Sequence, residues 1–142
     1  MKILRHRLTL GTVAPIQFLD VTQPVRDWVA ASGLRDGLLT LLSPHTTARI
    51  NINESEERLQ RDMTGFLKRL APRDGDWLHN LETVDDRDNA HAHLLGLFMA
   101  SSETIPVADG ALTLGGWQSI FFVELDGPRP ARSLDLQLMG PA

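Results

Sequence analysis

Two histidines one residue apart, His91 and His93, are the residues of this sequence best suited to chemistry. They lie in the segment Asp88–Leu94, where alanines beside each imidazole leave room for a ligand. Imidazole serves near neutral pH as a general acid, a general base or a metal ligand. In an extended segment both rings would lie on one face, whereas in a helix they would diverge by roughly 200° around the axis. The sequence leaves open both a loop here and a helix capped by Asn89.

A metal at this pair would need more ligands, because two histidines are too few. His45, which follows an apolar segment, is the natural third ligand. The sequence contains no cysteine, so any metal must be held by His, Asp or Glu. We therefore expect His45, His91 and His93 to converge on a divalent cation, Zn²⁺ or Mg²⁺, in an open site of catalytic type. The alternative is that they are hydrogen-bonded structural histidines or line a polar pocket.

Carboxylates and other polar groups complete the candidate site. Glu54 and Glu124 could act as a catalytic base or orient a ligand. The alternative for Glu54 is a carboxylate that only stabilises a helix N-terminus. The candidate substrate-binding groups are hydroxyls, amides, one indole and one guanidinium: Thr46, Thr47, Asn89, Ser101, Ser102, Trp117, Gln118 and Arg129. The hydroxyls could instead satisfy local backbone groups, and Trp117 could belong to the core or to an interface.

The composition is that of an ordinary globular protein. The 142 residues are 42% hydrophobic and 23% charged, which predicts one domain spanning residues 1–142. A net charge of -4 lacks the basic surplus that attracts nucleic acid or anionic lipid. The first residues lack the apolar stretch of a signal peptide, and no apolar run reaches the roughly 18 residues of a membrane span. We therefore expect a cytoplasmic protein with no nucleic-acid partner and no membrane partner.

The elements that position these residues can be predicted from hydrophobic periodicity. Alternating or continuous apolar segments predict strands at 3–10, 17–21, 37–42, 48–53, 104–107, 111–114, 118–125 and 134–138. Segment 37–42 is apolar almost throughout, so we expect it to be covered on both faces. Helical spacing predicts helices from Thr22 to the closing Gly33, over 54–70 and over 89–100.

The order of these elements predicts the fold class. Asp109-Gly110 predicts a tight hairpin, and residues 72–89 form a long polar loop of a kind that is usually functional or mobile. Strands at both ends with three helices between them predict an α+β domain, a mixed or antiparallel β-sheet with helices packed on it.

Several short motifs, taken together, resemble one known family. They are His45-Thr46-Thr47-Ala48, Ile52-Asn53-Glu54, Asn89-Ala90-His91-Ala92-His93-Leu94, Ser101-Ser102 with Thr104-Ile105-Pro106-Val107, Leu114-Gly115-Gly116-Trp117-Gln118 and Glu124-Leu125-Asp126-Gly127-Pro128-Arg129. In this order they resemble the YjbQ-like family, labelled secondary thiamine-phosphate synthase. The resemblance implies an α+β homotrimer with a polar pocket lined by these motifs. It also implies a weak transferase activity that joins a pyrimidine pyrophosphate to a thiazole phosphate and releases pyrophosphate.

Three positions depart from the family's motifs. Leu95 stands where a basic residue commonly follows the histidine motif, and Gly116 stands where threonine is usual. Arg49 stands where a small or apolar residue is more usual. If the missing base normally binds phosphate, a phosphate site here requires Arg49 or Arg129 in its place.

Two classes of function remain open. The first is an enzyme whose partner is a phosphorylated small-molecule substrate, with His45, His91, His93 and Arg129 stabilising the leaving group. The second is a non-catalytic trimeric module that binds a metabolite or a metal in the same pocket. Turnover with release of pyrophosphate distinguishes the two.

Overall fold

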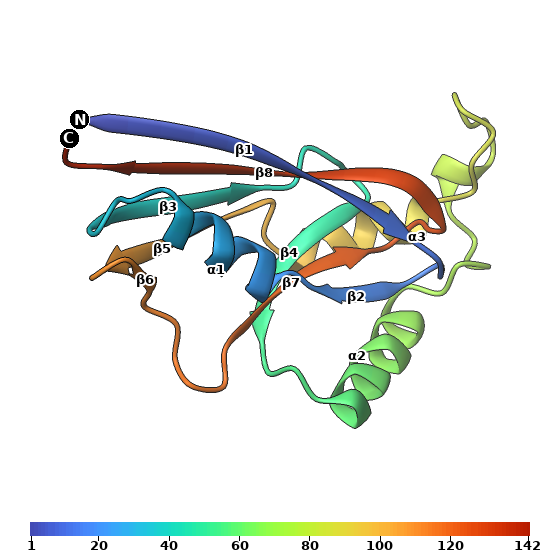
Figure 1. Cartoon of the computed structure of the whole chain (residues 1–142). Helices are drawn as coiled ribbons and strands as arrows, with labels where there is room; N and C mark the ends of the chain where they lie inside the picture. The colour runs from blue at the N-terminus through green and yellow to red at the C-terminus, as the bar shows by residue number, and fades with distance from the viewer.

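The computed structural model describes residues 1–142 and contains two antiparallel sheets and three α-helices (Figure 1). The strands are β1 (Lys2–Thr12), β2 (Gln17–Asp20), β3 (Gly37–Leu42), β4 (Ala48–Asn53), β5 (Ser102–Ala108), β6 (Ala111–Leu112), β7 (Ser119–Glu124) and β8 (Arg129–Gly140). The helices are α1 (Thr22–Ala31), α2 (Glu57–Leu70) and α3 (Ala90–Leu95), with single 3-10 turns η1 (Leu78–Asn80) and η2 (Gly96–Phe98). The predicted α+β class is confirmed. None of the helices has the length and apolar character needed to cross a bilayer.

One sheet has five strands in the order β1-β8-β3-β5-β6, and the other has three in the order β2-β7-β4. The strands β1 and β8 pair along most of their length, with Lys2 opposite Gly140, so the two termini lie side by side (Figure 1). In the smaller sheet β7 is the central strand and pairs with β2 and β4. A bridge between Ile50 and Ala100 connects β4 to the segment that leads into β5.

The main core lies between the inner faces of the two sheets and α1. It contains Leu39 and Leu41 of β3, alternate leucines of β8, and Val25 and Val29 of α1. A second cluster covers the outer face of the smaller sheet beneath α2 and α3, and includes Leu67, Leu95 and Phe121. Because β7 is therefore buried on both faces, its sequence is almost continuously apolar.

The five-stranded sheet is covered on one face only. Leu39 and Leu41 are completely buried, whereas Leu38 and Leu42 on the other face of β3 are 45% and 42% exposed. The prediction that segment 37–42 is covered on both faces is therefore wrong for the single chain, since no helix lies over the outer face of this sheet.

The helix ends differ slightly from the prediction. Thr22 lies inside α1 after the cap residue Val21, because its hydroxyl accepts the Ile120 N–H and so ties the helix to β7. Helix α2 is capped by the carboxylate of Glu56, which accepts the Leu59 N–H, so Glu54 lies outside the helix.

Two turn predictions are confirmed. Gly33 has a φ of 73° immediately after the last turn of α1, as a closing glycine should. Asp109 and Gly110 have φ values of 51° and 80° between β5 and β6, the left-handed conformation of a two-residue hairpin turn.

Candidate functional site

The two motif histidines lie on α3, so their side chains diverge and the extended alternative is wrong. His91 is only 4% exposed, and its Nδ1 has no hydrogen-bond partner. His93 is half-buried, and its ring meets His79 edge to face with 5.0 Å between ring centroids. Burial is the main cause that lowers the pKa of both His91 and His93, and the nearby Arg73 and His79, respectively, lower it further. Both are therefore neutral near pH 7.

His45 lies apart from this pair and is held as part of the fold. Its Nε2 accepts a hydrogen bond of 2.9 Å from the Ser133 N–H, and its ring packs edge-on against Phe122. Burial lowers the pKa of His45, and the neighbouring Arg132 adds to that effect.

The predicted three-histidine metal site is not formed. Nowhere in the chain do three His, Cys, Asp or Glu side chains come together so that they could hold a metal ion. The expectation that His45, His91 and His93 converge on one point is therefore wrong within a single chain, because α3 separates two of them and β8 holds the third. Within a single chain, the residues present do not form a site for a resident metal.

A buried carboxylate, Asp126, organises the polar residues next to α3. It accepts hydrogen bonds from Arg87 at 2.9 Å, Asn89 at 2.9 Å and Arg129 at 2.8 Å. Burial disfavours its charged form, but these three donors outweigh burial and lower the pKa of Asp126 to about 2. The other atom of the Asn89 amide, Oδ1, lies 3.2 Å from Nε2 of His79, so the network extends to the imidazole pair.

Arg49 carries an unpaired charge in the same region. Its side chain is half-buried, its Nε has no hydrogen-bond partner, and it takes part in none of the ion pairs of the chain. A Cβ atom at Gly96 would lie 2.9 Å from that Nε, so the glycine that begins η2 leaves room for the guanidinium. Burial and His79 lower the pKa of His93 most, Asp126 and Asp85 raise it, and Arg49 lowers it by a smaller amount. The site therefore presents a guanidinium without a counter-charge beside a histidine pair, an arrangement suited to an anion.

Glu124, a predicted base, is committed to the fold. It is completely buried and accepts hydrogen bonds from Arg132 at 2.6 and 2.9 Å and from Thr12 at 2.8 Å. These donors outweigh burial and lower the pKa of Glu124. Arg132 also donates to the hydroxyl of Thr47 at 2.9 Å. Because its oxygens are fully engaged, Glu124 is not available to accept a proton from a substrate.

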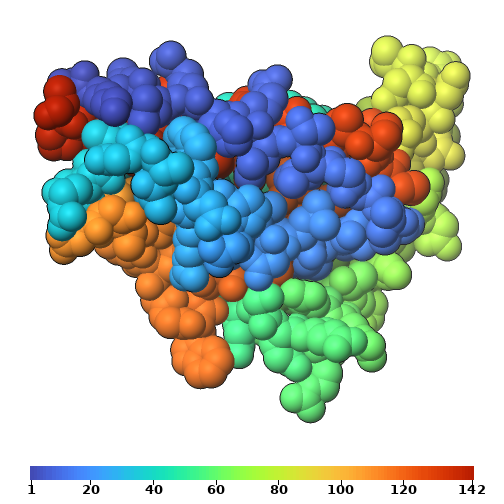
Figure 2. Space-filling model, viewed as in Figure 1, coloured from blue at the N-terminus to red at the C-terminus, as the bar shows by residue number.

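The remaining predicted residues are dispersed. The β4–β7 pair places Asn53 opposite Ser119 and Ala48 opposite Glu124, so Glu54, Trp117 and Gln118 lie at the end of the pair remote from Glu124. Trp117 is 80% exposed in the loop between β6 and β7, which projects from the body of the molecule (Figure 2). Three further predicted residues are exposed and make no side-chain hydrogen bond in the chain: Thr46, Ser101 and Ser102.

Sequence reasoning missed two residues of this site, His79 and Asp126. His79 lies in the polar loop that leads to Asn89, and the unusual length of that loop was the available signal. Asp126 and its partner Arg129 both lie in the motif 124–129, but its role was hidden because its other partners, Arg87 and Asn89, lie 39 and 37 positions away.

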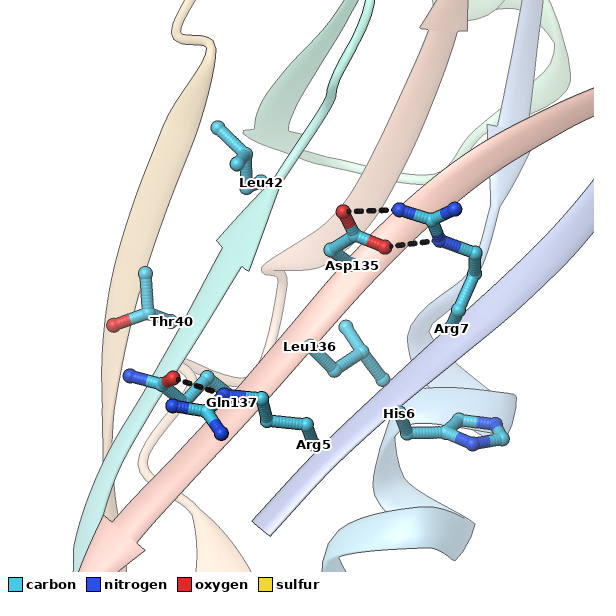
Figure 3. A pocket seen from close by; sticks show the side chains of 8 residues that line it. All are labelled: Arg5, His6, Arg7, Thr40, Leu42, Asp135, Leu136 and Gln137. Carbon is cyan, nitrogen blue, oxygen red and sulfur yellow. Dashed lines mark hydrogen bonds and ion pairs between the residues drawn. The ribbon is translucent and has the colours of Figure 1, made fainter. Parts of the chain in front are cut away.

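A depression of about 570 Å³ lies elsewhere, on the outer face of the five-stranded sheet (Figure 3). Its polar groups satisfy one another: Arg7 pairs with Asp135 at 2.6 Å, and Arg5 donates to Gln137 at 2.9 Å. Because these groups already bond to one another, they have few free donors or acceptors for a ligand. We therefore place the candidate site at Arg49, His79 and His93.

Comparison with known proteins agrees with the sequence motifs. The family model described as UPF0047 protein YjbQ-like matches residues 6–141. A UPF0047 protein of Methanothermobacter thermautotrophicus is 40% identical over 93% of this chain and 90% of its own length. The UPF0047 protein YugU of Bacillus subtilis is 32% identical over 94% of this chain and 97% of its own length.

Solved structures agree in fold. A YbjQ-like protein of unknown function from Sulfolobus solfataricus superposes with a TM-score of 0.92 and 36% identity, covering 99% of both chains. A hypothetical protein from Aeropyrum pernix superposes with a TM-score of 0.89 and 42% identity, over 97% of this chain and 99% of its own. The chain therefore belongs to the YjbQ-like UPF0047 family.

Proposed function

We propose that the protein binds a phosphorylated or pyrophosphorylated small molecule at Arg49, His79 and His93, and that it is a weak thiamine-phosphate-synthase-like transferase. The observation that supports this is the half-buried guanidinium of Arg49, which has no counter-charge in the chain. A half-buried charge without a counter-charge is less well solvated than one in open water, and its buried Nε has no acceptor in the chain. A phosphoryl group would supply both the negative charge and the oxygen acceptors that a guanidinium prefers.

The proposed reaction joins a pyrimidine pyrophosphate to a thiazole phosphate. A C–N bond forms between the two ring systems while the C–O bond to pyrophosphate breaks, and the electron pair leaves with the pyrophosphate. Arg49 would stabilise the charge that develops on the leaving group. His93, neutral near pH 7 because its pKa is lowered, would donate one N–H to the same oxygens. A divalent cation, Zn²⁺ or Mg²⁺, would bind together with the pyrophosphate as its counterion, and would not be held by the three histidines.

One observation favours the second candidate, a non-catalytic module that binds the same anion. The carboxylate beside the histidines, Asp126, is occupied by arginine and amide donors. Glu124 points to the other face of the smaller sheet and is occupied by Arg132, so neither is free to act as a base. The proposed transfer does not depend on a free carboxylate base, because its main requirement is that the charge of the leaving pyrophosphate be stabilised.

The test is release of pyrophosphate from the two substrates by the wild-type protein, Arg49→Gln and Arg69→Gln. Arg69 is an exposed arginine of α2 and serves as the matched control. We expect turnover by the wild type and the control, and a loss of about 100-fold in Arg49→Gln, as when a main charge stabiliser is removed. Binding of pyrophosphate without any turnover would favour the non-catalytic module instead.

We also propose that the protein assembles as a homotrimer. The outer face of the five-stranded sheet supports this, because it exposes Ile3, Leu38 and Leu42 among the paired charges shown in Figure 3. A second copy would cover these three apolar side chains and give β3 the second buried face that its sequence predicts.

A further inference from the structure

The outward-facing residues of β4 form a row that leads from the candidate site into a groove. Arg49, Asn51 and Asn53 point away from the main core, since they alternate with the core residues Ile50 and Ile52. The groove beyond Arg49 has a volume of about 300 Å³. Its lining comes from β2, β4, α2 and the segment around η2: Phe18, Asn51, Asn53, Met63, Phe66, Leu67, Leu70, Phe98 and Met99.

The walls of this groove are apolar but not filled by the chain itself. Helix α2 buries only Leu67 fully, while Phe66 remains 55% exposed. On the opposite wall Phe98 is 70% exposed. The apolar side of α2 is therefore incompletely covered, since Leu70 is also 41% exposed. An apolar concavity with a few polar groups on its floor is the usual form of a small-molecule site.

Two segments connect the groove to the proposed anion site, β4 and η2. Arg49 and Asn51 are next-but-one neighbours on β4, so their Cα atoms are roughly 7 Å apart. Gly96, which makes room for the guanidinium, begins the turn that ends at Phe98. One small molecule can therefore contact Arg49 and the groove together.

We infer that the groove is a ring-binding subsite, which takes a flat, uncharged aromatic or heteroaromatic ring whose anionic substituent lies at Arg49. No charged side chain lines the groove, while the unpaired Arg49 precedes its lining residue Asn51 on the same face of β4, so the charges match a molecule with one apolar end and one anionic end. The volume is at the lower limit of ligand pockets, roughly 300 to 1,000 Å³, which suits one ring system and not a lipid chain or a peptide. This inference rests on the proposed anion site and adds the place in the fold where the ring of its ligand lies.

The test is calorimetric titration of the purified protein with phenyl phosphate and with inorganic phosphate. We expect phenyl phosphate to bind about tenfold or more tightly than inorganic phosphate, because the ring buries apolar surface in the groove. Phe98→Ala should remove that difference and leave the affinity for inorganic phosphate unchanged. Leu97→Ala is the matched control, because Leu97 is 77% exposed beside Phe98 and does not line the groove. Both side chains are largely exposed, so neither variant should unfold.

Different failures of this test have different meanings. Equal affinities of the wild type for phenyl phosphate and inorganic phosphate would overturn the ring subsite and leave the anion site standing. An advantage for phenyl phosphate that survives Phe98→Ala would also overturn it. A change in sedimentation caused by Phe98→Ala alone would show that a second copy of the chain occupies the groove, and would replace the inference. Absence of binding by both phosphates would overturn the proposed anion site itself.

Discussion

At the residue scale, the two motif histidines have different environments and should have different roles. His93→Ala should abolish turnover with little loss of stability, since His93 is half-buried at the candidate site. His91→Ala should lower the free energy of unfolding by about 1–3 kcal/mol, because a nearly buried side chain is truncated. Thermal melting and pyrophosphate release, measured on the same samples below their melting temperatures, separate the two effects. A folded His93→Ala protein with wild-type turnover would remove His93 from the site.

Asp126 should give the protein a specific sensitivity to acid. Its pKa is lowered from an ordinary 3.8 to about 2, so the unfolded chain takes up a proton at a higher pH than the folded one. The stabilisation is therefore complete above about pH 4 and is lost as the pH falls toward 2, and it amounts to on the order of 2 kcal/mol. Urea unfolding at pH 5 and pH 2.5 measures this loss. The Asp126→Asn variant should have a lower free energy of unfolding than the wild type at pH 5. Its free energy of unfolding should fall less than that of the wild type between pH 5 and pH 2.5. An equal loss in both proteins would contradict the assignment.

At the element scale, Glu124 connects strands that are distant in sequence. It joins β7 to β8 through Arg132 and to β1 through Thr12. Glu124→Gln should lower the free energy of unfolding by about 3–5 kcal/mol, because it leaves the buried Arg132 without its counter-charge. Asp135→Asn, which breaks the exposed pair with Arg7, is the control and should cost less than about 1 kcal/mol. Chemical denaturation measures both, and similar costs would show that Glu124 does not have this role.

Most elements could be predicted because their causes are local. Alternation of apolar residues located the strands, and Gly33 and Asp109-Gly110 located their turns through backbone conformation. Helix starts were less accurate, since the side chains of Thr22 and Glu56 are set by partners outside the local pattern.

The candidate site could be predicted only in part. The sequence singled out the histidine segment, but it could not decide between loop and helix, and that choice separates His91 from His93. Arg49 was visible as a departure from the family's motif. Its lack of a counter-charge depends on packing against Gly96, which no local pattern encodes.

At the scale of the whole molecule, the open face of the five-stranded sheet predicts self-association. Sedimentation at micromolar concentration should show a trimer, and Leu38→Arg should shift it toward the monomer by placing a charge on that face. Leu78→Arg changes a residue that is 85% exposed outside this sheet and should leave the trimer intact. A wild-type protein that sediments only as a monomer would contradict the proposed assembly.

The proposed role of Arg49 is to bind an anionic ligand. The most direct test of this role is the affinity of the protein for pyrophosphate, measured by calorimetry. The wild type and Arg69→Gln should bind alike. Arg49→Gln should bind about 10- to 100-fold more weakly, the range expected when charge-assisted hydrogen bonds are lost. Gly96→Ala should weaken binding as well, because a Cβ there would displace the guanidinium. Binding by Arg49→Gln that equals the wild type, or no binding by the wild type, would contradict the account.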